Sequence, residues 1–174
     1  MKDYTKQSDD ILIDLICKGD YRAFEALYDR YFSRIFKQCY LFCLNTEKAN
    51  DLMQDVWIKI FFNIKSFKKE ASFSTWIYRI TTNHCLNQIK KKSKSEISLD
   101  DLEIEIPHSN GKEIITEAKK ILSRLSLEDR VLLIMKYMDE LTYEEMSIKL
   151  DIGVSAIKMR LSRLIKEIRK EIDI

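Results

Sequence analysis

Apolar residues recur along most of this chain at intervals of three and four, the spacing that lines up one face of an α-helix. In the first half, helices with capping residues at their starts are predicted from Ser8 to Gly19, Asp20 to Leu44, Thr46 to Ile64, and Ser72 or Ser74 to Lys92. In the second half the pattern predicts helices over residues 113–125, 126–138, 141–150 and 155–170, with capping-box spacing at Ser126–Asp129 and Thr142–Glu145. Only three glycines and one proline interrupt 174 residues, so we predict an all-α fold.

Residues 93–112 break the helical pattern. Five acids and no base lie between Ser95 and Ile106, and the single proline, Pro107, and Gly111 follow. Segments rich in like charge and turn residues are typical of linkers. The chain is therefore predicted to form two small helical domains, residues 1–92 and 113–174, joined by a flexible acidic linker over 93–112.

The predicted last helix has two different faces. Its apolar stripe should bury against the preceding short helix and consists of Ile157, Leu161, Leu164, Ile165 and Ile168. Between Ser155 and Lys170 the segment also holds six basic residues against one acid. A short capped helix, a turn over residues 151–153 and a basic second helix form the pattern of a helix-turn-helix, whose second helix lies in the major groove of DNA.

Helix geometry selects the side chains of this last helix that would face DNA. Lysine, arginine and serine side chains can bond the edges of DNA bases, and methionine can contact a thymine methyl. Basic side chains at the flanks of the helix suit contacts with phosphates. For base edges we expect Lys158, Met159, Ser162 and Arg163, and for phosphates Arg160 and Lys166. An amphipathic surface helix with lysines for solubility is the alternative that this segment alone leaves open.

The predicted helix over residues 46–64 also has an unusual outer face. Its core arc consists of Leu52, Met53, Val56, Trp57 and Ile60, and the opposite arc carries Asp51, Gln54, Asp55 and Lys59 together with Ile58 and Phe62. Apolar side chains among acids on an outer face indicate a protein-docking patch. A neighbouring element that covers Ile58 and Phe62 would explain them equally well.

Residues 66–92 combine aromatic, amide and basic side chains. The rings are Phe67, Phe73, Trp76 and Tyr78, and the amides are Asn83, Asn87 and Gln88. Aromatic side chains beside cations suit the stacking of unpaired bases and attraction of the phosphate backbone. Because Trp76 and Ile80 lie one turn apart, we expect Trp76 inside the domain, with the loop and the polar helix face left for nucleic acid.

Catalytic patterns are missing from the sequence. It has no phosphate-binding glycine loop, and only His84 and His108 could serve acid–base chemistry. A metal site from Cys39, Cys43, His84 and Cys85 is conceivable, but none of the four cysteines shows C-x-x-C spacing and free thiols are the simpler expectation. With no signal peptide and no apolar run of membrane length, we expect a non-enzymatic, cytoplasmic protein without metal or cofactor.

Three motifs together resemble a known family. In order and spacing, "NDLMQDVWIKIF", "FKKEASFSTWIYRI" and "LTYEEMSIKLDIGVSAIKMRLSRL" are similar to the signatures of bacterial RNA polymerase sigma factors of the sigma-70 family. The size and the two-domain plan resemble the extracytoplasmic-function (ECF) group, which retains only the second and fourth sigma domains. Asp151 stands where that family's turn most often has Gly, and Gly153 takes the place of a Ser or Pro cap.

The resemblance implies a role for each set of residues. Asp51, Gln54, Asp55, Ile58 and Phe62 would dock on the clamp helices of the largest subunit of core polymerase, and the second domain would contact the flap of the second-largest subunit. The melted minus-ten element would be bound, with one base flipped out, by Phe67, Lys68, Lys69, Ser72, Ser74, Arg79, Asn83 and Asn87. The last helix would bind the minus-thirty-five element through Ser155, Lys158, Met159, Arg160, Ser162, Arg163 and Lys166.

The family likeness also implies partners and a state. Promoter DNA, core polymerase and an anti-sigma factor would be the partners of a chain that is monomeric when free, and the acidic linker would thread through the RNA path of the polymerase. A stand-alone helix-turn-helix regulator, which would need dimers and a palindromic site, is the first alternative. A helical interaction adaptor without a DNA role is the second.

Overall fold

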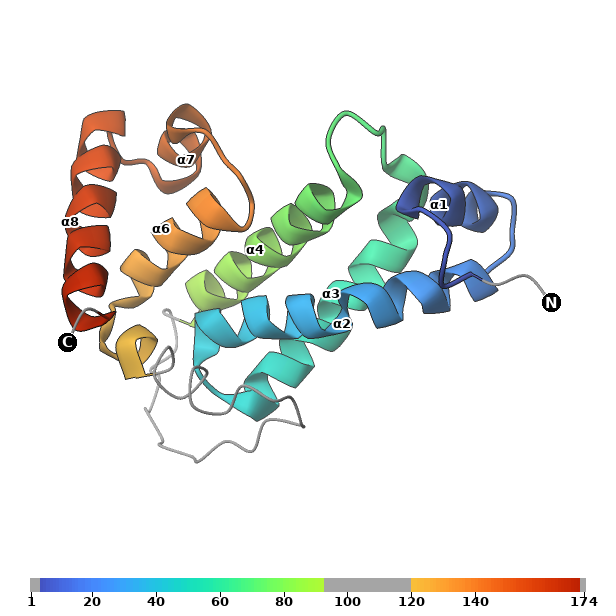
Figure 1. Cartoon of the computed structure of the whole chain (residues 1–174), viewed down its shortest axis with the longest axis horizontal. Helices are drawn as coiled ribbons and strands as arrows, with labels where there is room; N and C mark the ends of the chain where they lie inside the picture. Colours follow the sequence, from blue (N-terminus) through green and yellow to red (C-terminus); the bar gives the residue numbers. More distant parts are fainter. Residues whose placement is uncertain (1–3, 93–119, 173–174) are drawn as a thin grey trace. The chain divides into compact units, whose positions relative to one another are not determined.

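The computed structural model describes residues 4–92 and 120–172. These residues form helices and connecting turns without any strand, as the hydrophobic pattern predicts. The chain divides into two compact units, Met1–Leu99 and Asp100–Ile174 (Figure 1). The predicted linker over 93–112, and most of the helix predicted over 113–125, lie outside the described residues; helical turns are present at 120–124.

The N-terminal unit is built around one long helix. The elements are α1 (Asp9–Cys17), α2 (Arg22–Cys43), α3 (Thr46–Asn63), a short 3₁₀ turn η1 (Ile64–Ser66) and α4 (Phe73–Lys92). Helix α2 packs against α1, α3 and α4, while η1 packs against α1 and α3. The fully buried side chains come from every helix and include Leu12, Leu27, Ile35, Ile60 and Ile77. Each contributes about 1.5–3 kcal/mol by leaving water, so this unit has a core of its own.

The helix starts of this unit follow local capping rules, with two corrections. Ser8 caps α1, and the Ser72 hydroxyl accepts from the Thr75 amide at the start of α4, as expected. The cap of α3 is Asn45 rather than Thr46, because Asn45 has the extended backbone of a cap (φ −135°, ψ 131°) and its side-chain oxygen accepts from the Lys48 amide at 2.9 Å, whereas Thr46 already lies in the helix. Asp20 does not cap α2, because its carboxylate accepts from the Tyr4 hydroxyl at 2.7 Å instead.

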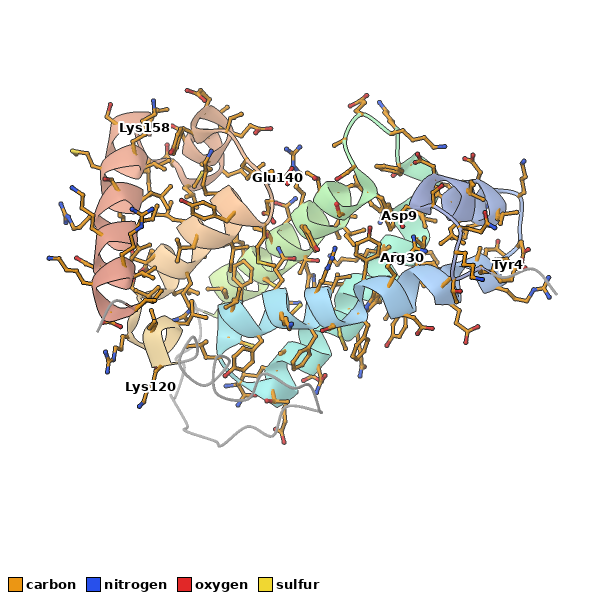
Figure 2. The ribbon with its side chains drawn as sticks, viewed as in Figure 1. Tyr4, Asp9, Arg30, Lys120, Glu140 and Lys158 are labelled. Atoms are coloured by element: carbon orange, nitrogen blue, oxygen red, sulfur yellow. The ribbon has the colours of Figure 1, made fainter. Side chains whose placement is uncertain are left out.

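Polar side chains hold elements of the N-terminal unit together. Gln38 of α2 is fully buried, and its Nε2 donates to the Thr82 hydroxyl at 2.8 Å and to the Tyr78 carbonyl at 3.1 Å, both on α4. Near the N-terminus, Arg30 and Tyr31 of α2 both bond the Asp9 carboxylate; Figure 2 labels Arg30 and Asp9 side by side. Burial and the hydrogen bond to Asp9 raise the pKa of Tyr31 well above its usual range.

The C-terminal unit consists of three described helices after those first turns. They are α6 (Leu127–Tyr137), α7 (Tyr143–Leu150) and α8 (Val154–Ile172), and α8 packs against both α6 and α7. The core between them contains Leu132, Met135, Leu141 and Met146 together with Ile157, Leu161 and Leu164 of α8. The apolar stripe predicted for the last helix therefore faces inward, although Ile165 and Ile168 are only half-buried.

Local signals in the C-terminal unit are confirmed. Ser126 caps α6, and Thr142 and Glu145 form a reciprocal capping box at the start of α7. Asp151 adopts the left-handed conformation at the end of α7, with φ 56°. Asp tolerates this conformation better than most residues because it can hydrogen-bond locally. The Gly153 carbonyl then accepts from the Ile157 amide at 3.1 Å, so the three-residue turn of a helix-turn-helix joins α7 to α8.

Candidate functional site

The outer side of α3 exposes all five residues that the sequence singled out. Asp51, Gln54 and Asp55 are exposed, Ile58 is 56% exposed and Phe62 is 77% exposed. We call these five residues the α3 face. In the part of the chain that the structure describes, no neighbouring element covers Ile58 and Phe62. The core arc of α3 is buried as expected, except that Leu52 is only half-buried.

The apolar part of this surface is larger than the sequence indicated. Phe61 is 38% exposed, and its ring contacts the rings of Phe62, Phe24 and Tyr21 at centroid distances of 5.7, 5.1 and 5.8 Å. Periodicity alone did not select Phe61, because it lies between the core arc and the outer arc of α3. A strip of exposed aromatic side chains therefore continues from the α3 face toward the start of α2.

His84 links α4 to the α3 face. Its side chain is 5% exposed, and Nε2 lies 3.3 Å from Oδ2 of Asp55, which is itself 53% exposed. The imidazole is thus held inside the unit. Through its contact with Asp55, His84 joins α4 to the acidic end of the α3 face.

Three aromatic rings in mutual contact organise the loop before α4. Phe67 contacts Phe73 at 5.5 Å and Trp76 at 5.4 Å, and Phe73 contacts Trp76 at 5.6 Å between ring centroids. Phe73 is buried, but Trp76 is only half-buried, so the expectation that Trp76 lies inside is wrong. Helix α4 buries Phe73, Ile77 and Cys85, a register in which Trp76 stands at the edge of the core.

The polar residues predicted to meet single-stranded DNA lie in this loop and along α4. Lys68, Lys69, Ser72, Asn83 and Asn87 are exposed, and Ser74 and Arg79 are half-buried. Ser72 has a structural task as well, because its hydroxyl lies within hydrogen-bonding distance of the hydroxyls of Ser74 and Thr75.

One contact in this loop was not indicated by the sequence. Lys69 has a left-handed backbone with φ 58°, and its Nζ lies 2.9 Å from Oδ1 of Asp14 on α1. That hydrogen bond raises the pKa of Lys69. The ion pair therefore ties the tip of the loop to the first helix of the unit.

The outer side of α8 presents a basic and mostly exposed surface. Ser155, Lys158, Met159, Ser162, Arg163 and Lys166 are all exposed. Arg160 differs, because its Nε lies 2.6 Å from Oδ1 of Asp129 and its Nη2 lies 3.9 Å from Oε2 of Glu128. The acids in the first turn of α6 thus hold Arg160 within the unit, a role that helix periodicity could not indicate. Its contact with a phosphate stays a prediction.

An aromatic ring lies under one of the predicted base contacts. The Nζ of Lys158, labelled in Figure 2, is 5.1 Å from the ring centroid of Tyr143, the first residue of α7. The Nζ of Lys136 on α6 is 4.4 Å from the centroid of the same ring. Tyr143 therefore connects a supporting helix to a side chain on the predicted DNA-binding helix.

Three further findings concern metal binding, the cysteines and membrane insertion. Within 4–92 and 120–172, no three His, Cys, Asp or Glu side chains gather as a metal site would require. The Cys43 thiol donates to the Cys39 carbonyl at 3.3 Å, and burial raises the pKa of Cys43. No helix in the described ranges is both long and apolar enough to cross a bilayer.

Comparison with family models and known proteins gives a consistent result. The model of Sigma-70 region 2 matches residues 27–95, and that of Sigma-70 region 4 matches residues 115–168. The chain is 32% identical to the ECF RNA polymerase sigma factor SigW of Bacillus subtilis over 92% of this chain and 94% of SigW. It is 27% identical to the ECF RNA polymerase sigma-E factor of Escherichia coli K12, over 90% of each chain.

Two solved structures share the fold. The sigma factor RpoE of Bartonella quintana, solved with the anti-sigma factor NepR, is similar with a TM-score of 0.65 and 21% identity, over 87% of this chain and 97% of that one. CnrH, solved with the cytosolic domain of CnrY, is similar with a TM-score of 0.60 and 17% identity, over 96% of this chain and 98% of that one.

Proposed function

Since the chain belongs to the ECF group of the sigma-70 family of RNA polymerase sigma factors, we propose that its three exposed surfaces divide the work of promoter recognition. The N-terminal domain, residues 1–92, binds core polymerase and the minus-ten element. The C-terminal domain, residues 113–174, binds the minus-thirty-five element, and residues 93–112 link them. The observation that supports this division best is that the α3 and α8 sets lie mainly on the exposed sides of helices whose other sides build a core. The minus-ten set lies in the largely exposed loop before α4 and along that helix.

The α3 face docks on the clamp helices of the largest polymerase subunit. The apolar groups of Ile58 and Phe62 supply area that can be removed from water, and the acids around them supply charge complementarity to a basic partner. A protein interface with an apolar centre and a polar rim has this composition. The C-terminal domain makes the second polymerase contact, with the flap of the second-largest subunit.

The loop over residues 67–72 and α4 bind the melted minus-ten strand. The half-buried ring of Trp76 and its neighbour Phe67 can stack on unpaired bases, and Lys68 can neutralise backbone phosphates. Asn83 and Asn87, one turn apart and both exposed, offer amide donors and acceptors to base edges. An unstacked base is extruded into a pocket here without any chemistry on the base.

Helix α8 reads the minus-thirty-five duplex in the major groove. Lys158, Ser162 and Arg163 meet base edges, Met159 with its exposed thioether meets a thymine methyl, and Lys166 contacts phosphate. Each domain alone makes a small footprint, so the free chain binds promoters weakly and the holoenzyme binds them tightly. The chain acts in the cytoplasm as a monomer and performs no catalysis of its own.

An anti-sigma factor controls this chain. Both similar solved structures were determined as complexes, one of them with a protein named as an anti-sigma factor. An inhibitor that covers the α3 face would remove the docking surface from the polymerase.

Promoter binding by the reconstituted holoenzyme tests the division of surfaces. Core polymerase with the wild-type chain should protect a cognate promoter, and the loss caused by Arg163→Ala should disappear when the minus-thirty-five element is deleted. Asn83→Ala should behave in the same way toward the minus-ten element. If each variant loses the same factor on all templates, the assignment of surfaces is wrong; tight binding by a dimer of the free chain to a palindrome would support a stand-alone regulator instead.

A further inference from the structure

We propose that Tyr143 is a positioning residue for promoter recognition, whose ring holds the Lys158 ammonium where α8 needs it. The inference rests on the proposed function of α8 and adds to it a residue of α7. Lys158 Nζ and Lys136 Nζ lie 5.1 and 4.4 Å from the Tyr143 ring centroid, within the range of cation–π attraction. The ring therefore attracts a side chain that would otherwise sample many rotamers in water.

The position of the Tyr143 ring is itself fixed by the helix start. Thr142 and Glu145 cap α7 reciprocally, with the Thr142 amide 2.8 Å from Oε2 of Glu145 and the Glu145 amide 3.2 Å from the Thr142 hydroxyl. Tyr143, between them, begins the helix that Met146 anchors in the core. The left-handed Asp151 then sets the path from α7 into α8. The position of the Lys158 ammonium is thus set by a ring on a capped, packed helix and not only by its own flexible side chain.

This arrangement has an energetic consequence for DNA binding. Ordering a long side chain at an interface costs free energy, and that cost falls when the free protein already holds the side chain near its bound position. The attraction is of the size expected for exposed cation–π pairs, so the expected effect on promoter affinity is about two- to five-fold. Lys136, held at the same ring and 3.4 Å from the Leu141 carbonyl, adds a second positive charge beside Lys158.

The contact itself can be tested without DNA. Reductive ¹³C-methylation keeps the lysine charge, and the Lys158 signal can be assigned as the one lost in Lys158→Arg. In the full chain that signal should be shifted upfield by the ring, should stay there in Tyr143→Phe and should move to the position of free methyl-lysine in Tyr143→Leu. An unshifted signal in the wild-type chain would overturn the geometric part of the inference.

The role in recognition is tested with a double-mutant cycle on holoenzyme. Tyr143→Leu should weaken promoter binding about two- to five-fold, Tyr143→Phe should bind like the wild type, and Tyr143→Leu should have no further effect in a Lys158→Met background. Equal losses in both backgrounds would show that Tyr143 acts independently of Lys158, and a loss in Tyr143→Phe would assign the effect to the hydroxyl; either result overturns the inference.

Failure of the underlying function would look different. Suppose that Lys158→Met binds promoter DNA like the wild type, while the Lys158 methyl signal of the wild-type chain is shifted by the ring. The ring contact then exists, but the proposed role of Lys158 in DNA binding by α8 is wrong. The recognition role of Tyr143 is overturned with it. Thermal unfolding of every variant distinguishes a loss of folding from a loss of DNA binding. If Tyr143→Leu proves unstable, Tyr143→Phe keeps the packing of the ring.

Discussion

Replacing Phe62 by serine should separate docking from folding. Phe62 is 77% exposed, so most of its surface stays in water until a partner covers it. Full burial of a phenylalanine is worth about 1.5–3 kcal/mol, and the exposed share of that is about 1–2 kcal/mol. Phe62→Ser should therefore weaken binding to core polymerase about 5- to 30-fold. The unfolding free energy should change by no more than about 0.5 kcal/mol, apart from the lost contact with the Phe61 ring.

The assay is a titration of fluorescently labelled chain with core polymerase, paired with thermal unfolding of each variant. Ile58 and Ile11 form a matched pair, since Ile58 is 56% exposed on the α3 face and Ile11 is 46% exposed on α1. Ile58→Ser should weaken docking and Ile11→Ser should not, although the chemical change is identical. Ile60→Ala, at a position with no exposed surface, should instead cost about 2–5 kcal/mol of stability. The docking role is refuted if Phe62→Ser binds core polymerase within a factor of two of wild type, or if Ile11→Ser loses as much as Ile58→Ser.

Three further predictions concern the interior and the basic surface. Gln38→Leu leaves the buried Thr82 hydroxyl without its amide donor and should lower the unfolding free energy by about 1–3 kcal/mol in urea titrations; an unchanged midpoint would contradict this. Because the folded pKa of Tyr31 is raised, the unfolded state releases this proton first, so stability should fall as pH rises above about 10. Tyr31→Phe should reduce that loss of stability at high pH. Identical profiles of unfolding free energy against pH for the variant and the wild type would exclude a contribution from Tyr31. Lys166→Ala should weaken promoter binding on all sequences alike and reduce the slope of log affinity against log salt by about one, whereas a sequence-dependent loss would make Lys166 a base contact.

Elements and their starts could be predicted wherever the deciding interactions are local. Ser126 and Thr142 each need only an amide two or three positions ahead, so their spacing identifies them as caps. Asp20 has the same chemistry, but a tyrosine from another segment takes its carboxylate. Asn45 and Thr46 compete as neighbours, and the backbone angles that favour Asn45 arise only in the folded turn.

The site could be predicted as a set of faces but not as a set of contacts. A helical wheel places Arg160 on the flank of α8, but only tertiary packing brings Asp129 to within 2.6 Å of it. Tertiary packing also brings Lys69 to Asp14 and Lys158 to Tyr143, and in both pairs the two residues are distant in sequence. Trp76 is predicted to lie inside, but α4 turns a neighbouring stripe toward the core and leaves Trp76 half-buried. Periodicity identifies the sides of a helix, and it leaves the partner of each side chain open.

In vitro transcription tests the whole proposal most directly. Core polymerase from a related bacterium, supplied with the purified chain and genomic fragments, should start transcripts at sites that core polymerase alone does not use. Those starts should fail when Phe62→Ser and Ile58→Ser are combined and should move or vanish when the upstream elements are changed. Transcripts identical with and without the chain would contradict the proposed role in initiation.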